Sequence, residues 1–273
     1  MAEELKPLKL HLVYDYNMKK FVLHITFFCC LILVTSCGIS EDCFKGNGNQ
    51  ITQMFPLEDF TKIKVYDGVG LVLKESTDYE VKVTTSEHII DNIELTIEGN
   101  MLVIKDNSSC NLTRDYGQTV VYISVPDGNI NPRIPELEIH SKSEQLIQSD
   151  GVLHSPILRL FSLGDDGDGA GTGDFDIKVE NAQLVIESNN VSNFYINGHS
   201  EEMLLNFYFG NGRFYGKDFH VENVKVYHRG SNDMFVYPIQ KIEGIINATG
   251  NVVLENVPPI IDVEEVFRGR LIY

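Results

Sequence analysis

The residues best suited to hold a cation form the acidic run Asp165-Asp166-Gly167-Asp168, which opens a glycine-rich stretch. Alternating Asp and Gly can wrap oxygen ligands around a hard cation such as Ca²⁺. The spacing does not fit an EF-hand, because Ile177 stands where that loop needs its bidentate Glu. We therefore treat Asp165, Asp166 and Asp168 as a candidate calcium site. The simpler alternative is a solvated loop between strands.

Cys37 offers a second kind of chemistry, because it ends a segment typical of an export signal. Met18-Lys19-Lys20 supplies a short cationic start, and residues 21–34 are mostly apolar. That run is short for a bilayer span and fits the hydrophobic region of a secretory signal. It ends in Val34-Thr35-Ser36-Cys37, which resembles the lipobox of bacterial lipoproteins. The resemblance implies acyl chains on the Cys37 thiol and retention at a membrane; the alternative is a buried apolar helix with an incidental cysteine.

These features divide the amino-terminal region into three parts. Residues 1–17 precede the signal, and the simplest explanation is a start codon placed too early, with Met18 as the true start. Residues 18–36 form the expected lipoprotein signal peptide, and residues 37–54 a Gly- and Asn-rich tether. The tether contains Ser40-Glu41-Asp42, which resembles the surface-export signal of some Gram-negative lipoproteins. We expect an outer-membrane lipoprotein that faces outward, although acidic pairs are also common in tethers.

A disulfide is possible between the two cysteines that would remain in the mature chain. Cys29 and Cys30 leave with the signal and Cys37 is acylated, so Cys43 and Cys110 are left. Two cysteines in an oxidising compartment can pair. Cys43 lies in the tether, however, and nothing in the sequence places it near Cys110. Two free thiols therefore remain the alternative.

Composition limits the possible partners. The chain has 22 Lys+Arg against 39 Asp+Glu, a net charge of −17. Binding to nucleic acid is therefore not expected, because the phosphate backbone needs cationic neutralisation. The apolar content of 43% excludes a mostly disordered chain and a polytopic membrane protein. The partners that we expect are the membrane, through lipidated Cys37, and a glycan or protein ligand.

The first half of the mature chain alternates apolar and polar residues with the period of a β-strand. Residues 79–83 alternate cleanly, residues 93–104 predict a hairpin with its turn at 98–100, and residues 120–125 predict another strand. No segment there predicts an amphipathic helix longer than two turns. We predict an antiparallel β region over residues 55–150.

The second half repeats with a period of 21 residues. Glutamate recurs at Glu180, Glu201, Glu222, Glu243 and Glu264, and asparagine at Asn190, Asn211 and Asn232. A unit of that length cannot bury its apolar side alone, but stacked units form a continuous core. We therefore predict a β-helix or solenoid over residues 151–273, with the asparagines in a turn ladder and the glutamates in one column. The alternative is a meander with coincidental spacing.

Aromatic residues crowd the middle of this repeat region. They are Tyr195, Phe207, Tyr208, Phe209, Phe214, Tyr215, Tyr227, Phe235 and Tyr237. Period two places Phe207 and Phe209 inside and Tyr208 outside. Exposed tyrosines on a regular sheet can stack on sugars or bind a protein partner, or they can be ordinary cross-strand pairs. His199 and His220, also 21 apart, could form a weak zinc site, although two surface histidines are the simpler interpretation.

Residues 55–265 resemble one known family, the auto-transporter adhesin head GIN domain. The most specific parts are YEVKVTTSEHIIDNIELTIEGNMLVI (79–104) and the repeats from Leu158 onward. The small turns typical of the family appear only in divergent form, as at Gly210-Asn211-Gly212 and Thr249-Gly250. The resemblance implies an envelope lipoprotein with a β-helical body and an adhesive role. It carries over no catalytic residues.

Taken together, these features favour an all-β envelope binding or adhesion module that is not an enzyme. No nucleotide-binding glycine loop, CxxC pair or nucleophile elbow occurs in the sequence. The alternative is a surface glycan lyase or hydrolase on a β-helix scaffold. Such enzymes need clustered carboxylates, whereas Asp218, Asp233 and Asp262 fall at different phases of the repeat. A structural lipoprotein without a dedicated ligand is a third possibility.

Overall fold

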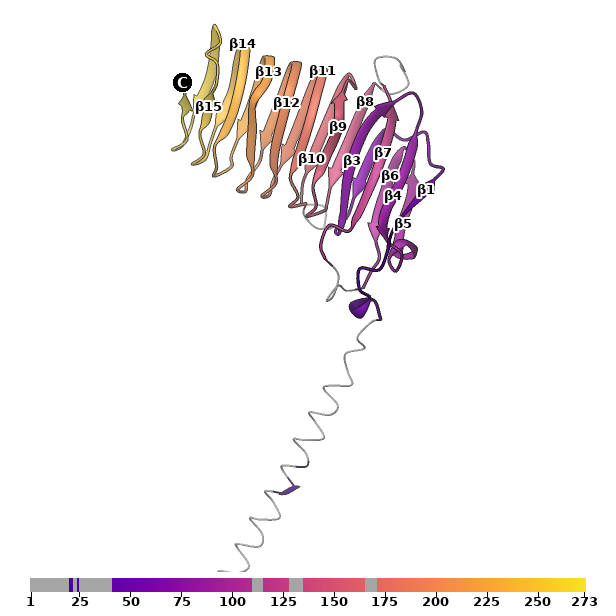
Figure 1. Ribbon diagram of the computed structural model, residues 1–273. Coiled ribbons are helices and arrows are strands. Elements are labelled where there is room, and N and C mark those ends of the chain that lie inside the picture. Colours follow the sequence, from indigo (N-terminus) through magenta and orange to yellow (C-terminus); the bar gives the residue numbers. More distant parts are fainter. Residues whose placement is uncertain (1–19, 22–23, 25–40, 110–114, 128–134, 165–170) are drawn as a thin grey trace, which may run out of the picture.

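The computed structural model describes residues 20, 21, 24, 41–109, 115–127, 135–164 and 171–273 (Figure 1). The predicted all-β class is confirmed: from residue 41 on, the described residues form strands and two short 3-10 helices, η1 (Glu41–Phe44) and η2 (Ile90–Asn92), without an α-helix. Within the described ranges, no helix has both the length and the apolar character needed to cross a bilayer.

All strands join one 17-stranded sheet. The first nine are β1 (Gln50–Phe55), β2 (Lys62–Val65), β3 (Val69–Ser76), β4 (Glu80–Ser86), β5 (Ile93–Glu98), β6 (Met101–Asp106), β7 (Thr119–Pro126), β8 (Glu136–Ser141) and β9 (Ile147–Leu153). The other eight are β10 (Ile157–Ser162), β11 (Phe175–Ser188), β12 (Asn193–Phe207), β13 (Arg213–His228), β14 (Met234–Ile246), β15 (Val252–Leu254), β16 (Ile260–Glu265) and β17 (Leu271–Ile272). Strand β9 spans residue 150, where we expected the antiparallel region to end.

The pairing in the first half is mixed, so the prediction of an antiparallel region is only partly correct. The hairpin predicted at 93–104 is confirmed as the antiparallel pair β5–β6, and β4 pairs antiparallel with β1 and β7. Strand β2, however, pairs in parallel with β6 and β8, and β3 in parallel with β7 and β9. Alternation could not reveal this, because side chains alternate with period two in both kinds of sheet.

In the second half, each strand from β10 to β14 pairs in parallel with the next strand, and Figure 1 shows β11 to β15 side by side in chain order. At the end of the chain, β16 pairs in parallel with β14 and β17 with β15. Paired residues are 19 apart between β11 and β12, as in Leu184 and Met203. They are 21 apart over most of β12–β13, as in Met203 and Val224, and 18 apart in Val224 and Ile242 of β13–β14. A constant 21-residue period is therefore not confirmed. Register shifts between the neighbouring strands change the spacing from one pair to the next.

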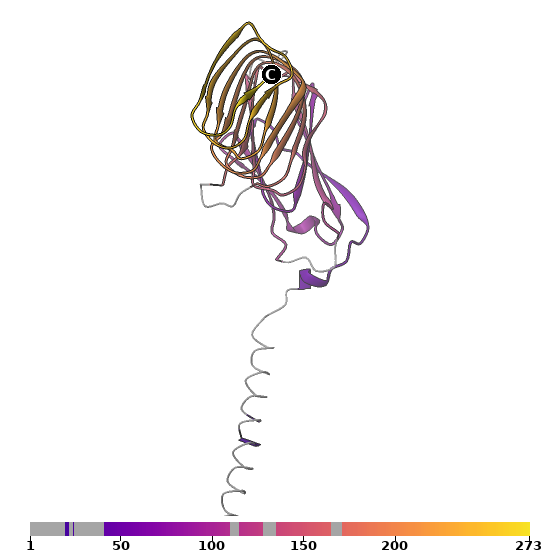
Figure 2. The same cartoon turned by 90° about the vertical axis from the view of Figure 1, so that its left-hand side faces the viewer.

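The core runs along the inside of this stack. Figure 2, with the C-terminal end facing the viewer, shows the strands turning around a common centre. Register places one column of side chains along that centre, all buried: Phe175, Phe194, Phe214, Met234, Val252 and Leu271. The rings of Phe175 and Phe194 stack with centroids 4.7 Å apart. Each strand therefore buries its apolar side against its two neighbours. The β-helix or solenoid with a 21-residue repeat, predicted over residues 151–273, is nevertheless not confirmed, because the separation of paired residues varies along the stack.

Two glycines allow the strands to approach closely at bends. Gly198 has φ 114° and Gly244 has φ 137°, a region that side chains with a Cβ rarely adopt. A Cβ on Gly198 would lie 2.2 Å from the Val179 carbonyl oxygen, and one on Gly244 would lie 1.8 Å from that of Val226. Neither position can carry a side chain without moving the strand beside it.

The predicted asparagine ladder is present only in part, because Asn211 is joined to Asn190 through its backbone N–H and not through its side-chain amide. The Asn211 N–H donates to the Asn190 carbonyl oxygen at 3.0 Å, and the Asn232 side-chain amide donates to the Asn211 carbonyl oxygen at 2.5 Å. The Asn190 amide instead donates to the Ser162 carbonyl oxygen at 3.0 Å. The turns are thus tied to one another along the stack.

Candidate binding surface

Three aromatic side chains form a ladder on the outer face of the stack. Tyr195, Tyr215 and Phe235 lie in register on β12, β13 and β14. Each follows a fully buried residue of the inner column, so the strand period turns its ring outward. Ring centroids are 4.8 Å apart between the two tyrosines, at an interplanar angle of 1°, and 5.7 Å apart between Tyr215 and Phe235, at 8°. We call these three residues the ring ladder.

The stacking decides which part of the rings a partner can reach. Because the rings lie face to face along the stack, the faces of Tyr215 are covered and the ring edges point outward. Tyr195, at one end, is 39% exposed. Burial raises the pKa of its hydroxyl, and Asp174 and Tyr215 raise it further, so the hydroxyl stays neutral and can donate a hydrogen bond at neutral pH.

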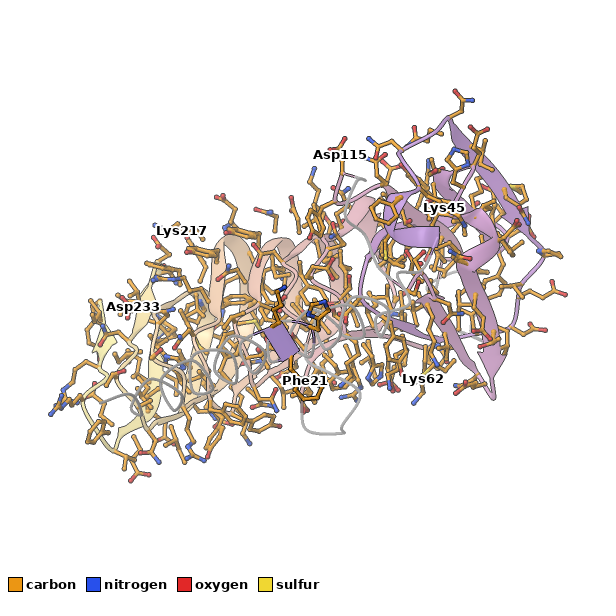
Figure 3. All side chains as sticks on the ribbon, turned by 90° about the horizontal axis from the view of Figure 1, so that it is seen from below. Phe21, Lys45, Lys62, Asp115, Lys217 and Asp233 are labelled. Carbon is orange, nitrogen blue, oxygen red and sulfur yellow. The ribbon has the colours of Figure 1, made fainter. Side chains whose placement is uncertain are left out.

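Charged and apolar residues border the ladder. The Lys217 ammonium lies 4.9 Å from the Phe235 ring centroid and 3.1 Å from a carboxylate oxygen of Glu255. Beyond Phe235 the same register continues through Val253 to Ile272, which is 41% exposed. Seen from below in Figure 3, Lys217 and Asp233 lie toward the C-terminal end of the stack and Lys45 and Lys62 toward the other end. The ladder is thus part of a longer apolar stripe.

Other predicted aromatic positions are partly confirmed. Phe207 is buried as predicted, whereas Phe209, predicted to point inside, is 58% exposed. The reason is that β12 ends at Phe207, so the strand alternation no longer applies to Phe209. Tyr208 is partly exposed, and its hydroxyl donates to Glu187 at 2.9 Å. The sequence therefore identified the aromatic region but not which rings face solvent.

The predicted glutamate column is wrong. Glu180 pairs with His199, Glu243 pairs with Lys225 and Asp262, and Glu264 pairs with Ile245. The number of residues between paired positions differs from one strand pair to the next, so glutamates spaced 21 apart in sequence do not line up across the strands. Where they remain close to cations they are neutralised locally: the Lys241 side chain lies 2.6 Å from Glu243, and its hydrogen bond lowers the pKa of Glu243. No continuous anionic face results from these pairs.

His199 and His220 are paired in register, as their spacing predicted. The partners of their rings nevertheless differ. His220 packs on the Tyr237 ring with centroids 4.3 Å apart, and His199 Nε2 lies 3.6 Å from a carboxylate oxygen of Glu222. The two histidines thus lie in one row without being each other's ring partners.

The candidate calcium ligands Asp165, Asp166 and Asp168 lie outside the described residues, so this prediction stays open. Later in the sequence, Asp174 is held by hydrogen bonds within the stack. Its Oδ1 accepts the Asn193 N–H at 2.9 Å and the Asn193 side-chain amide at 3.1 Å.

Of the cysteines predicted to matter, Cys37 and Cys110 lie outside the described residues. Cys43 is buried and disulfide-bonded. Close to it in the chain, the Asn47 amide donates to Asp115 at 2.7 Å, and the Asp115 N–H donates back to Asn47 at 2.9 Å. The tether is therefore held against the segment that follows residues 110–114, and the pairing of Cys43 with Cys110 stays a prediction.

A cavity of about 210 Å³ lies at the same end of the sheet and was not predicted from the sequence. Its lining includes Asp67, Asp106, Tyr116, Thr119 and Glu144, which come from segments far apart in the chain. Burial raises the pKa of Asp67, and the charge of Glu144 raises it further. Nothing in the sequence signals that these residues converge, because mixed strand pairing brings them together.

The pKa of Glu144 is shifted in the opposite direction to that of Asp67. Burial alone would raise its pKa, but hydrogen bonds from the Gln145 side chain at 2.6 Å and from the Gly68 N–H at 3.1 Å lower it below the ordinary value. The cavity therefore holds one carboxyl that is harder to ionise and one that is easier to ionise.

Comparisons with solved structures agree on the fold. An adhesin described as putative from Bacteroides fragilis matches with a TM-score of 0.71 at 17% identity, covering 83% of this chain and 98% of that one. Another from Parabacteroides distasonis matches with a TM-score of 0.59 at 13% identity, over 83% and 98%. A "putative lipid binding protein" from the same species matches with a TM-score of 0.52 at 16% identity, over 84% and 98%. At these identities the likeness shows the fold alone.

A comparison with curated proteins found no match. The family model described as "Putative auto-transporter adhesin, head GIN domain" matches residues 59–258, most of the chain and nearly the range over which the sequence resembled that family. The chain therefore belongs to this head GIN domain family.

Proposed function

We propose that this protein is a lipid-anchored, non-catalytic binding module of a Gram-negative cell envelope. In this proposal residues 18–36 direct export, lipidated Cys37 holds the protein at the outer membrane, and Ser40-Glu41-Asp42 sends it to the outer surface. The residues between Cys37 and β1 tether the sheet, whose outer face meets the partner. The family and its adhesin neighbours support the binding role.

The ring ladder is the observation on which the binding role rests. Three in-register rings on a regular sheet, continued by Val253 and Ile272, give a flat stripe of ring edges and apolar side chains. Recognition of a sugar by stacking needs a free ring face, and Tyr215 has none left. A protein segment can instead lie along the edges and accept hydrogen bonds from the tyrosine hydroxyls. The ladder therefore favours a protein ligand over a glycan.

The test is a binding panel of extracellular-matrix proteins and glycans, probed with the full chain in detergent, with and without calcium. We expect binding to a protein that Tyr215→Ala weakens strongly, because aromatic residues at the centre of an interface often contribute about 2 kcal/mol or more. Tyr122→Ala is the matched control, since Tyr122 is also a tyrosine on a strand and is 43% exposed. Equal binding by wild type and Tyr215→Ala would exclude the ladder as the contact.

The calcium arm of the panel separates the two candidate surfaces. Binding that needs calcium and is lost when Asp165, Asp166 and Asp168 are changed to Asn would assign the contact to that loop. Binding that ignores calcium would leave the ladder as the contact surface.

One observation favours a second function, a glycan hydrolase. The cavity that holds Asp67 and Glu144 contains two carboxyls whose pKa values are displaced in opposite directions, as in an acid and base pair. Release of sugar products by the wild type, lost in Asp67→Asn and kept in Tyr215→Ala, would establish that activity. Absence of products across the glycan panel would leave the binding module.

A further inference from the structure

Three parallel strands end at one place on the sheet, and each contributes a possible metal ligand there. Strand β3 pairs in parallel with both β7 and β9, so the carboxyl ends of the three strands meet at the same edge. Glu75 is the next-to-last residue of β3, Asp127 follows β7 directly, and His154 follows β9 directly. The fold thus brings together a glutamate, an aspartate and a histidine from distant parts of the chain.

Their side chains converge closely enough to share one ion. One ligand atom from each of the three lies within 4.8 Å of the others. His154 Nδ1 is 2.8 Å from Glu75 Oε2, and the His154 backbone N–H donates to Glu75 Oε1 at 2.5 Å. The Glu75 side chain is only 9% exposed, whereas that of His154 is 36% exposed. The site is therefore anchored on a nearly buried carboxylate and remains open to solvent on the histidine side.

We propose that Glu75, Asp127 and His154 bind one divalent first-row metal ion, with Zn²⁺ the best match. Imidazole suits Zn²⁺ better than Ca²⁺ or Mg²⁺, and the two carboxylates supply oxygen ligands. The metal takes the place of the hydrogen-bonded proton between His154 Nδ1 and Glu75 Oε2, and that proton passes to solvent. Tetrahedral zinc with bonds of about 2.0–2.2 Å separates two ligand atoms by roughly 3.4 Å, so the 2.8 Å pair need open only slightly.

The local charge supports a cation at this place. The hydrogen bond to Glu75 is the main cause that raises the pKa of His154, burial opposes it, and the charges of Asp127 and Glu180 raise it further. Glu180 comes from strand β11, beside β9. Three carboxylates therefore favour a positive charge at the His154 ring, and a divalent ion satisfies them better than a proton does.

A second Glu–His pair in the protein differs from the proposed site in its third charged residue, which is a lysine instead of an aspartate. His140 Nε2 lies 3.0 Å from Glu138 Oε2, much like the pair of His154 and Glu75. The other oxygen of Glu138, however, contacts the Lys62 ammonium at 2.9 Å, where the proposed site has Asp127. A cation already fills the third position, so the Glu138 pair serves as a matched control that should not hold a metal.

The test is a calorimetric titration of Zn²⁺ into the metal-free full chain in detergent. The visible spectrum of bound Co²⁺ provides a second readout. We expect one tight zinc ion per chain. Glu75→Gln, Asp127→Asn and His154→Ala should each weaken it at least about tenfold, since changes to groups outside the ligand set already cost 10–100-fold. His140→Ala should bind as the wild type does.

Several outcomes would overturn the assignment. These are absence of tight zinc binding by the wild type, unchanged affinity in Glu75→Gln and Asp127→Asn, or loss of zinc in the double variant His199→Ala/His220→Ala instead. Circular dichroism of each metal-free variant checks folding, and Asp127→Asn provides the decisive arm if changes at the nearly buried Glu75 unfold the protein. Zinc should also raise the thermal midpoint of the wild type but not of Asp127→Asn.

Discussion

Acid should destabilise this protein through one histidine inside the stack. His228 is fully buried, with its ring against the edge of Phe207 at a centroid distance of 6.4 Å, and its Nδ1 accepts the Gly230 N–H at 3.3 Å. Burial lowers the pKa of His228 from 6.5 to about 4, although the Asn232 backbone and the charge of Asp233 oppose the shift. The folded protein therefore keeps this ring neutral at pH values where the unfolded chain protonates it.

Proton linkage gives the sign and the size of the change in stability that His228 causes as the pH falls. Between the unfolded value of 6.5 and the folded value of about 4, the unfolded state binds more protons, so stability falls as pH falls through that window. At about 1.4 kcal/mol for each pKa unit, the full effect is about 3 kcal/mol. About 2 kcal/mol of it is lost between pH 7 and pH 5.

The free energy of unfolding can be measured at several pH values by urea unfolding monitored with far-ultraviolet circular dichroism. Circular dichroism is used because the chain has no tryptophan to report unfolding by fluorescence. His228→Asn keeps an acceptor for the Gly230 N–H but cannot titrate. Between pH 7 and pH 5, the free energy of unfolding of this variant should therefore fall by about 2 kcal/mol less than that of the wild type. His220→Asn, at an exposed ring, is the control. Equal pH dependence in wild type and His228→Asn would refute the reasoning.

Three further predictions concern the stack and its tether. Gly244→Ala should destabilise the protein by about 1–3 kcal/mol in urea unfolding, because the residue has a positive φ and its Cβ would meet the Val226 carbonyl, whereas Gly46→Ala, with open space, should not. Phe194→Ala should cost about 3–5 kcal/mol by the same measurement, since the ring is fully buried in the inner column; a smaller loss would mean that the column can collapse. Cys43→Ala should cost about 4 kcal/mol if the closed loop runs to Cys110, and mass spectrometry of unreduced peptides should find the Cys43–Cys110 link.

Local patterns predicted the strands well but could not predict how they pair. Alternation located the hairpin of β5 and β6 because both strands and their turn are contiguous in the chain. The parallel pairing of β3 with β7 and β9 depends on chain crossings that leave no periodic mark. The same limit hid the cavity at Asp67 and the cluster at His154, whose members come from several strand ends.

The sequence repeat correctly indicated stacked strands in the second half, but it did not predict which side chains line up across them. Glutamates at a constant interval suggested one column, yet register shifts place Glu243 opposite Lys225. The ring ladder instead follows an interval of 20 residues, from Tyr195 to Tyr215 to Phe235, because it lies on a different part of each strand. Side-chain columns in such a stack depend on where each strand bulges, which spacing alone does not encode.

The parallel stacking of β11 to β14 also has a mechanical consequence. With the anchor that we propose at Cys37 and a partner held at the ring ladder, a pull is carried through the strands between them and bypasses the strands beyond Phe235. Because each strand contacts only its neighbours, such a load should detach strands one after another, each releasing a limited length of chain. In the binding role that we propose, the protein should therefore lengthen stepwise under load before it detaches from its partner.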